Sequence, residues 1–232
     1  FEQVGHRYFL PYSYAYMAID RVLLGDFESA DALLERALRL AQSESVQGFV
    51  ARHFASSSAY LQGHHERALA FADPNFAAAD ARGEQLPRLL AGLIQADVAI
   101  QRNELEQADA KLESIRSAAQ WYPFQRTWYS TSLARLRLGQ ARLDEAQVAL
   151  DEALELRRVL GRTHFQQVSA LDLVHVELLR AGARDEQANA TCERAVERLL
   201  ARAQAIDDRE LRRSFLDRMP DNAALLALAS TR

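Results

Sequence analysis

The chain has 232 residues and a formal net charge of −4 at pH 7; 49% of its residues are hydrophobic and 26% are charged. This length is enough to bury one large core or two small ones, and the negative charge argues against a direct role in binding nucleic acid. The single cysteine, Cys192, excludes an intramolecular disulfide framework and fits a reducing compartment, so we expect a cytoplasmic protein.

The composition predicts an all-α chain. Alanine, leucine, glutamate and arginine abound, whereas glycine (nine) and proline (five) are scarce and no run rich in valine, isoleucine and threonine suggests a sheet. No apolar run approaches the roughly 20 residues that cross a bilayer, so we expect no membrane partner. Because the chain begins at Phe1 without an initiator methionine, we expect it to be a piece of a longer polypeptide.

A turn followed by an alanine-containing amphipathic helix recurs along the chain. In Leu138–Leu156 a helix end and a turn of small residues precede Ala146, Leu150 and Ala153, whose spacing puts them on one helical face. Alanine there leaves room for another helix to approach closely. Comparable alanines recur about every 40 residues, so the pattern predicts five stacked units. The anchoring alanines are Ala30, Ala68, Ala108, Ala146 and Ala188.

The first unit spans residues 12–42. Pro11 is acceptable near the start of its first helix, and Gly25 supports a tight turn between its two helices. Asp26 is expected to cap the second helix, and Phe27 to wedge between the two.

The second unit, residues 46–72, is the least regular. Its second helix runs into Pro74, where we expect it to end or kink. We expect Phe76–Arg82 to form a short extra helical piece before Gly83.

The third and fourth units span residues 86–119 and 124–160, and an aromatic cluster separates them. We expect Trp121 and Phe124 to fill the junction between the units. For Trp128 a core position and a binding surface are equally supported, because tryptophan is frequent in both.

The fifth unit spans residues 164–205, and capping helices follow at 208–229. Cys192 occupies the slot of Leu150 in the fourth unit, which predicts a buried thiol. Helices around Glu210–Met219 and Ala223–Ala229 should cover the end of the array, since an uncovered terminal unit would expose a hydrophobic face.

Two of these turns resemble the tetratricopeptide repeat (TPR). The motif Gly-Asp-Phe-x-x-Ala at Gly25–Ala30 is followed seven residues later by Ala37, and Gly139–Ala146 with Ala153 is similar but has a longer turn. The resemblance covers roughly residues 12–203, with a period of about 40 in place of the usual 34 and with most boundary tryptophans and prolines missing. It implies a right-handed α–α superhelix like the repeats of large bacterial ATP-binding signalling and transcriptional regulators, whose other domains would lie outside this chain.

No motif for enzymatic chemistry is present. The chain lacks a glycine-rich phosphate loop, a Gly-x-Ser-x-Gly elbow and a His-Glu-x-x-His pair. His64 and His65 are adjacent and point in different directions on a helix, which favours a solvent-facing turn over a metal site. Glu152 and Glu155 lie beside arginines on an expected solvated face. We therefore expect no catalytic residue, no metal and no cofactor.

In the TPR pattern the first helices of the units line a concave groove. The residues at fixed offsets before the anchoring alanines would line this groove, and they mix apolar side chains with isolated polar ones. This composition disfavours a groove that holds the acidic end of a peptide with several lysines and arginines. Asp97 and Arg135 could instead simply pair with each other. The candidate groove residues are His53, Tyr60, Asp97, Trp128, Arg135 and Glu177.

These observations support two hypotheses. The first is a non-enzymatic interaction or sensory module of a cytoplasmic regulatory protein, which binds a protein segment, a peptide or a small effector in its groove. The second is a structural spacer or oligomerisation scaffold without a small ligand. A deep pocket with aromatic and polar walls favours the first, whereas a large apolar patch on an outer face favours the second.

Overall fold

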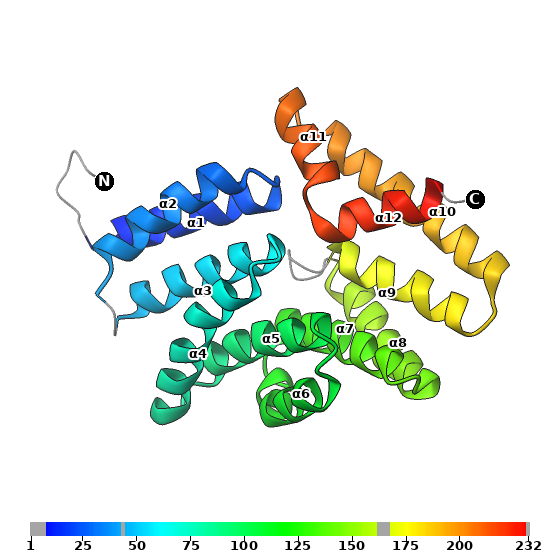
Figure 1. The fold of residues 1–232 in the computed structure, drawn as a ribbon, viewed down its shortest axis with the longest axis horizontal. Helices are drawn as coiled ribbons and strands as arrows, with labels where there is room; N and C mark the ends of the chain where they lie inside the picture. Colours follow the sequence, from blue (N-terminus) through cyan, green and yellow to red (C-terminus); the bar gives the residue numbers. More distant parts are fainter. Residues whose placement is uncertain (1–7, 43–44, 162–167, 231–232) are drawn as a thin grey trace.

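The computed structural model describes residues 8–42, 45–161 and 168–230, and these residues form twelve α-helices and no strand (Figure 1). The prediction of an all-α chain is confirmed. The start of the fifth expected unit, at residue 164, lies outside the described residues. The helices are α1 (Leu10–Leu23), α2 (Phe27–Leu40), α3 (Val46–Leu61), α4 (His65–Arg82), α5 (Gln85–Gln101), α6 (Leu105–Ala119), α7 (Pro123–Gly139), α8 (Leu143–Leu160), α9 (Val168–Ala181), α10 (Asp185–Gln204), α11 (Arg209–Asp217) and α12 (Pro220–Ser230).

The helices are arranged in consecutive pairs. Each odd-numbered helix packs against the even-numbered helix that follows it, from α1 with α2 to α11 with α12. The first helices also contact one another in succession, α1 with α3, α3 with α5, α5 with α7 and α7 with α9. Figure 1 shows the pairs following one another around an arc, with the second helices α4, α6 and α8 on its outer side.

The anchoring alanines lie in the buried contacts between helices. Each is on the second helix of its pair and is fully buried, because a methyl group allows the two helix axes to come together without a cavity. Cys192 is also fully buried, as its position in the apolar stripe predicted. The buried anchors are Ala30, Ala68, Ala108, Ala146 and Ala188.

The five turns within these pairs share one conformation. In each turn a single residue has a positive φ, and the residue after it donates its backbone N–H to a carbonyl at the end of the preceding helix, as Asp26 does to Arg21 at 3.0 Å. Two of the five positions are glycine, which adopts this conformation without strain, and the others are asparagine or alanine. The left-handed residues are Gly25 (φ 72°), Gly63 (74°), Asn103 (59°), Ala141 (57°) and Ala183 (55°).

The first turn is built as the sequence predicts. The Asp26 carboxylate accepts a hydrogen bond from the backbone N–H of Ser29 at 3.3 Å and thereby caps α2. Phe27 is 4% exposed and packs in the core between the helices. Local side-chain chemistry therefore fixes where α2 begins.

The sequence predicts that the helix ends or kinks at Pro74, but helix α4 does not end there. It continues to Arg82, and the residues from Phe76 onward belong to the same helix. Proline cannot donate a hydrogen bond to the carbonyl of Ala70, but both residues lie on the exposed face, where water can satisfy that carbonyl. On the opposite face Asn75 is buried and donates to the Phe49 carbonyl at 3.2 Å, which ties the helix to α3.

The aromatic cluster between α6 and α7 is divided between solvent and core. Trp121 is 78% exposed, so its expected core position is wrong. It precedes Pro123, the first residue of α7, and therefore lies in the connecting turn, on no helix face. Phe124 is half-buried, and Trp128 is only 1% exposed.

The C-terminal pair covers the fifth pair and also reaches the first. Helix α12 packs on α9 and α10, with Leu225 fully buried against Leu173 and Leu199. At the end of α11, Arg218 donates to both carboxylate oxygens of Glu28 in α2, at 2.7 and 2.8 Å. The two ends of the arc therefore meet (Figure 1).

Substitution of Gly25 tests this meeting of the two ends. We expect Gly25→Ala to lower the free energy of unfolding by about 1–3 kcal/mol more than Gly63→Ala, measured by urea titration. Both variants strain a left-handed residue, at about 1–2 kcal/mol each. Only at Gly25 would the new Cβ lie 2.6 Å from a backbone oxygen, that of Ser214 in α11, whereas Gly63 has open space. Equal losses in the two variants would contradict the packing of α11 on this turn.

Candidate functional site

Several of the predicted groove residues meet on the first-helix side of the arc. The buried carboxylate of Asp97, in α5, accepts hydrogen bonds from Trp128 Nε1 at 2.7 Å and from Ser132 Oγ at 2.5 Å, both in α7. Tyr60 in α3 is also buried, and Gln101 Nε2 donates to its hydroxyl at 3.0 Å. Trp128 is thus a core residue that orients Asp97, and its side chain offers no binding surface.

Arg135 lies among the acidic groups of this region. The sequence suggested that it pairs with Asp97, but its guanidinium donates instead to Asp221 Oδ1, at 3.2 Å. Asp221 belongs to the first turn of α12, so the C-terminal helix supplies the partner. The side chains of Arg135 and Asp221 are 19% and 24% exposed. We call Tyr60, Asp97, Trp128, Arg135, Glu177 and Asp221 the inner cluster.

The pKa values in the inner cluster reflect its burial and its single cation. Burial raises the pKa of the Asp97 carboxyl, and Arg135 opposes part of this shift. Burial likewise raises the pKa of Glu177, again against the effect of Arg135. Burial lowers the pKa of Arg135, but Asp221, Tyr60 and Asp97 outweigh this effect and raise it above its ordinary value. The cluster is therefore held together by one guanidinium that stays charged.

His53, the sixth predicted groove residue, has a different environment. It is 5% exposed, and its ring stacks on Phe49 at 6.2 Å between centroids and is tilted against Phe54 at 5.4 Å. Burial lowers its pKa to about 4, so the imidazole is neutral at pH 7. His53 is therefore part of the aromatic core of α3.

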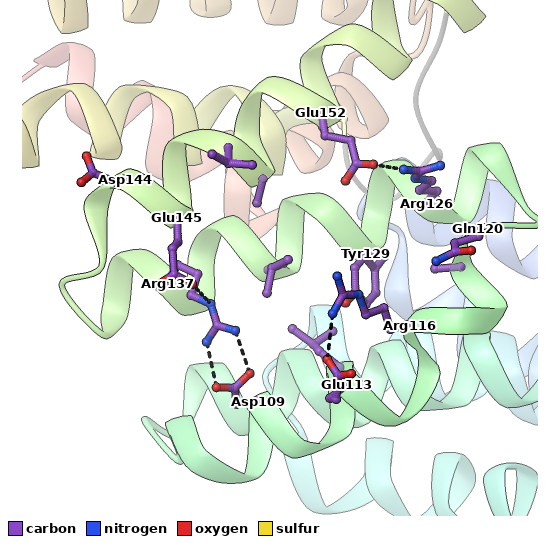
Figure 2. A pocket seen from close by; sticks show the side chains of 15 residues that line it. Asp109, Glu113, Arg116, Gln120, Arg126, Tyr129, Arg137, Asp144, Glu145 and Glu152 are labelled. Carbon is purple, nitrogen blue, oxygen red and sulfur yellow. Dashed lines mark hydrogen bonds and ion pairs between the residues drawn. The ribbon is translucent and has the colours of Figure 1, made fainter.

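A solvent-accessible groove lies elsewhere, between the second helices α6 and α8 with α7 as its floor (Figure 2). Its volume is about 490 Å³, and we call it the α6–α8 groove. Five carboxylates and three arginines line it, an excess of two negative charges. The charged lining residues are Asp109, Glu113, Arg116, Arg126, Arg137, Asp144, Glu145 and Glu152.

Ion pairs across α6, α7 and α8 fix most of these charges. Arg137 donates to both oxygens of Asp109, at 2.8 and 3.0 Å, and lies 3.3 Å from Glu145 (Figure 2). At the other end Arg126 pairs with Glu152, which also accepts from Ser130 Oγ at 2.7 Å. The hydrogen bonds from Arg137 lower the pKa of Asp109. Charges arranged in this way can orient a ligand by electrostatic attraction but are poorly suited to proton transfer at neutral pH.

The groove also presents apolar side chains to solvent. Val148 on α8 is 71% exposed, and Leu133 and Tyr129 of α7 form part of the floor. Burial raises the pKa of the Tyr129 hydroxyl, so the phenol is neutral at pH 7. Apolar contacts beside an excess of negative charge suit a ligand that is both cationic and amphipathic.

Sequence reasoning missed this groove because it considered only positions on the first helices. Val148 offered a signal, since it is a large apolar residue outside the stripe of Ala146, Leu150 and Ala153 in the same helix. An apolar residue on an otherwise charged helical face is one that the core does not require. The sequence around Val148 does not indicate that α6 forms the other side of the groove.

Comparisons of the chain with protein-family models, with curated proteins and with solved structures find no match. In the part of the chain that the structure describes, no group of three or more His, Cys, Asp or Glu side chains is placed to hold a metal ion. No described helix combines the length and the hydropathy needed to cross a membrane.

Proposed function

We propose that the chain is a TPR-like right-handed superhelix that serves as a non-enzymatic protein-interaction module of a cytoplasmic regulatory protein. Two observations support the repeat architecture. The same left-handed turn precedes the anchoring alanine in all five pairs. The first helices contact one another in succession, as stacking of equivalent units requires.

We assign the docking of a partner to the α6–α8 groove. The first-helix side is the other candidate, but there Asp221 of α12 already pairs with Arg135, and Leu225 of the same helix is buried. The α6–α8 groove combines a volume of about 490 Å³ with the exposed side chain of Val148, and this combination carries the proposal.

The chemistry of the groove favours a basic amphipathic segment of another protein. The three lining arginines already pair with carboxylates of the groove. The excess negative charge available to a ligand is therefore at Asp144, since Glu145 is shared between Arg137 and Arg142. Lysine or arginine side chains of a helical ligand would lie near these carboxylates, and its apolar face would pack on Val148 and Leu133. The attraction between exposed charges should weaken with salt.

Binding of designed peptides tests the proposal. We expect the purified chain to bind amphipathic helical peptides with a Lys/Arg face and a Leu face, and to ignore matched peptides with Glu in place of Lys/Arg, measured by fluorescence anisotropy. Val148→Arg should weaken binding by about tenfold or more, since each factor of ten corresponds to about 1.4 kcal/mol of lost contact and like-charge repulsion.

Val159→Arg is the matched control, because Val159 lies on the same helix, is 64% exposed and does not line the groove. Failure of both peptide sets to bind, or equal weakening by the two arginine substitutions, would contradict docking in this groove. Turnover of any substrate by the purified chain would contradict the non-enzymatic part of the proposal.

A second candidate, an oligomerisation scaffold, is favoured by one observation. Tyr8 and Phe9, just before α1, and two residues of α1 are large apolar side chains exposed to solvent, which a second chain could cover. Sedimentation of the chain over a range of concentrations distinguishes the two, since a scaffold associates without peptide. The exposed residues are Tyr8, Phe9, Tyr16 and Met17.

A further inference from the structure

A second cavity lies where the two ends of the arc meet, and we call it the seam pocket. Its volume is about 320 Å³, within the range of small-molecule sites. One wall consists of the ends of α1 and α3, and the other consists of the start of α9 together with residues from the end of α10 to the start of α12. Most of the lining residues are apolar, among them Leu24 and Leu61 on the first wall and Phe215 and Met219 on the second.

The seam pocket contains one cation without a carboxylate partner among the described residues. Arg202 of α10 lines it, with its guanidinium 5.5 Å from the Phe215 ring centroid. Its Nη2 donates to Ser169 Oγ at 2.9 Å, but its buried Nε has no hydrogen-bond partner in the described chain. Arg202 is half-buried, and a guanidinium that is partly removed from water is usually paired with an acid.

The other polar groups of the seam pocket are already engaged. Asp221 pairs with Arg135, and Asn222 bonds with Ser169 and donates to the Phe215 carbonyl at 2.8 Å. Asp172 is the acid that raises the pKa of Arg202. It already pairs with Arg157 at 2.7 Å and with Arg198 at 2.9 Å. Burial lowers the pKa of Arg202, because the attraction of Asp172 does not offset the loss of hydration of the guanidinium. The pocket therefore offers apolar walls and one positive charge that lacks a counter-ion.

We propose that the seam pocket binds a small amphipathic anion, a carboxylate on an apolar body, with the carboxylate at Arg202 and the body between Leu24 and Phe215. A carboxylate supplies the acceptors that a guanidinium prefers and the charge that Arg202 lacks. The walls supply the hydrophobic contact that holds the remainder of the ligand. A cationic ligand is disfavoured because it would meet Arg202 at close range.

Binding there would act on the shape of the whole chain. The two walls belong to opposite ends of the arc. These ends also meet through the exposed Arg218–Glu28 pair, the Arg218 guanidinium 5.2 Å from the Phe27 ring centroid, the packing of Met219 on the N-terminal core and the close approach of Gly25 to Ser214. A ligand that contacts both walls binds the closed form better than any form in which the ends have separated, and so stabilises the closed form. The site thus deepens the proposed function by adding a small effector to a module that docks a protein segment.

Calorimetric titration of the full chain with octanoate and with 1-octanol tests the inference, because the two probes share an apolar body and differ in the carboxylate. We expect octanoate to bind with one site per chain and octanol to bind at least about tenfold more weakly. Arg202→Gln should reduce octanoate affinity by about tenfold or more, because it removes the positive charge that the carboxylate contacts, and should leave octanol binding unchanged.

Two further variants keep the test decisive. Arg213→Gln removes a cation that is 85% exposed on α11, outside the seam pocket, and should leave octanoate binding unchanged. Leu24→Trp fills the pocket from the opposite wall and should abolish binding while the chain stays folded by circular dichroism.

Absence of octanoate binding to the folded chain, or equal affinities in wild type and Arg202→Gln, would overturn the assignment. Binding of basic peptides in the α6–α8 groove depends on Val148 and is measured separately, so failure of one site leaves the other result intact.

Discussion

Replacement of Trp128 by alanine is expected to lower the free energy of unfolding by about 3–5 kcal/mol. The side chain is 1% exposed, so its removal leaves a large cavity between α5 and α7. The substitution also deletes the donor at 2.7 Å from Asp97 Oδ2, which leaves a buried carboxylate with one hydrogen bond fewer. Urea unfolding followed by circular dichroism measures the loss.

Trp121→Ala is the matched control for this change. Trp121 is 78% exposed in the turn before α7, so its truncation should change the free energy of unfolding by no more than about 0.5 kcal/mol. The two tryptophans are the only two in the chain, and each single variant leaves the other as a fluorescence probe. Similar losses from the two substitutions would show that Trp128 is not the core residue described above.

Replacement of Arg135 by methionine is expected to lower the free energy of unfolding at pH 7 by about 2–4 kcal/mol, somewhat less than the usual cost of removing one partner of a fully buried ion pair, because the pair is only partly buried. The loss follows because the acidic groups of Asp97, Glu177 and Asp221 would be left without the guanidinium that compensates them. Methionine retains much of the apolar length of the side chain, so the effect isolates the charge.

The pH dependence of this variant has a definite sign. Burial raises the folded-state pKa values of Asp97 and Glu177 above their ordinary values of 3.8 and 4.5, and loss of Arg135 should raise them further. As the pH falls from 7 towards those ordinary values, the folded variant takes up protons before the unfolded chain does. The difference between variant and wild type should therefore shrink with falling pH, in urea titrations at several pH values.

Arg158→Met provides the control for the loss of an arginine as such. Arg158 is 73% exposed on α8 and pairs with the exposed Glu155, so its substitution should cost no more than about 1 kcal/mol at any of these pH values. A loss for Arg135→Met that stayed constant with pH would contradict the role of the neighbouring carboxylates.

The first-helix side shows how far the sequence supports a functional interpretation. Residues selected there as ligand contacts, among them Asp97, Trp128 and Arg135, are used by the chain for its own packing. Polar residues at regular positions on first helices looked available because the sequence could not show what covered them. The acidic partner of Arg135 comes from α12, 86 residues away in the chain.

Features set by neighbouring residues could be predicted from the sequence alone. Helical periodicity identified the buried stripe of Ala146, Leu150 and Ala153, and a short polar side chain before a helix identified the cap at Asp26. These features depend on contacts within one or two helical turns, and the spacing of residues in the sequence determines such contacts directly.

Other features depended on packing between distant segments. Only the tertiary structure decided that Trp128 is buried while Trp121 is exposed, and that Pro74 lies on a face where its missing hydrogen bond is harmless. It also decided that Arg218 reaches Glu28 across 190 residues. The physical reason is that periodicity specifies which side of a helix is apolar, whereas the identity of the segment that covers that side depends on the path of the whole chain.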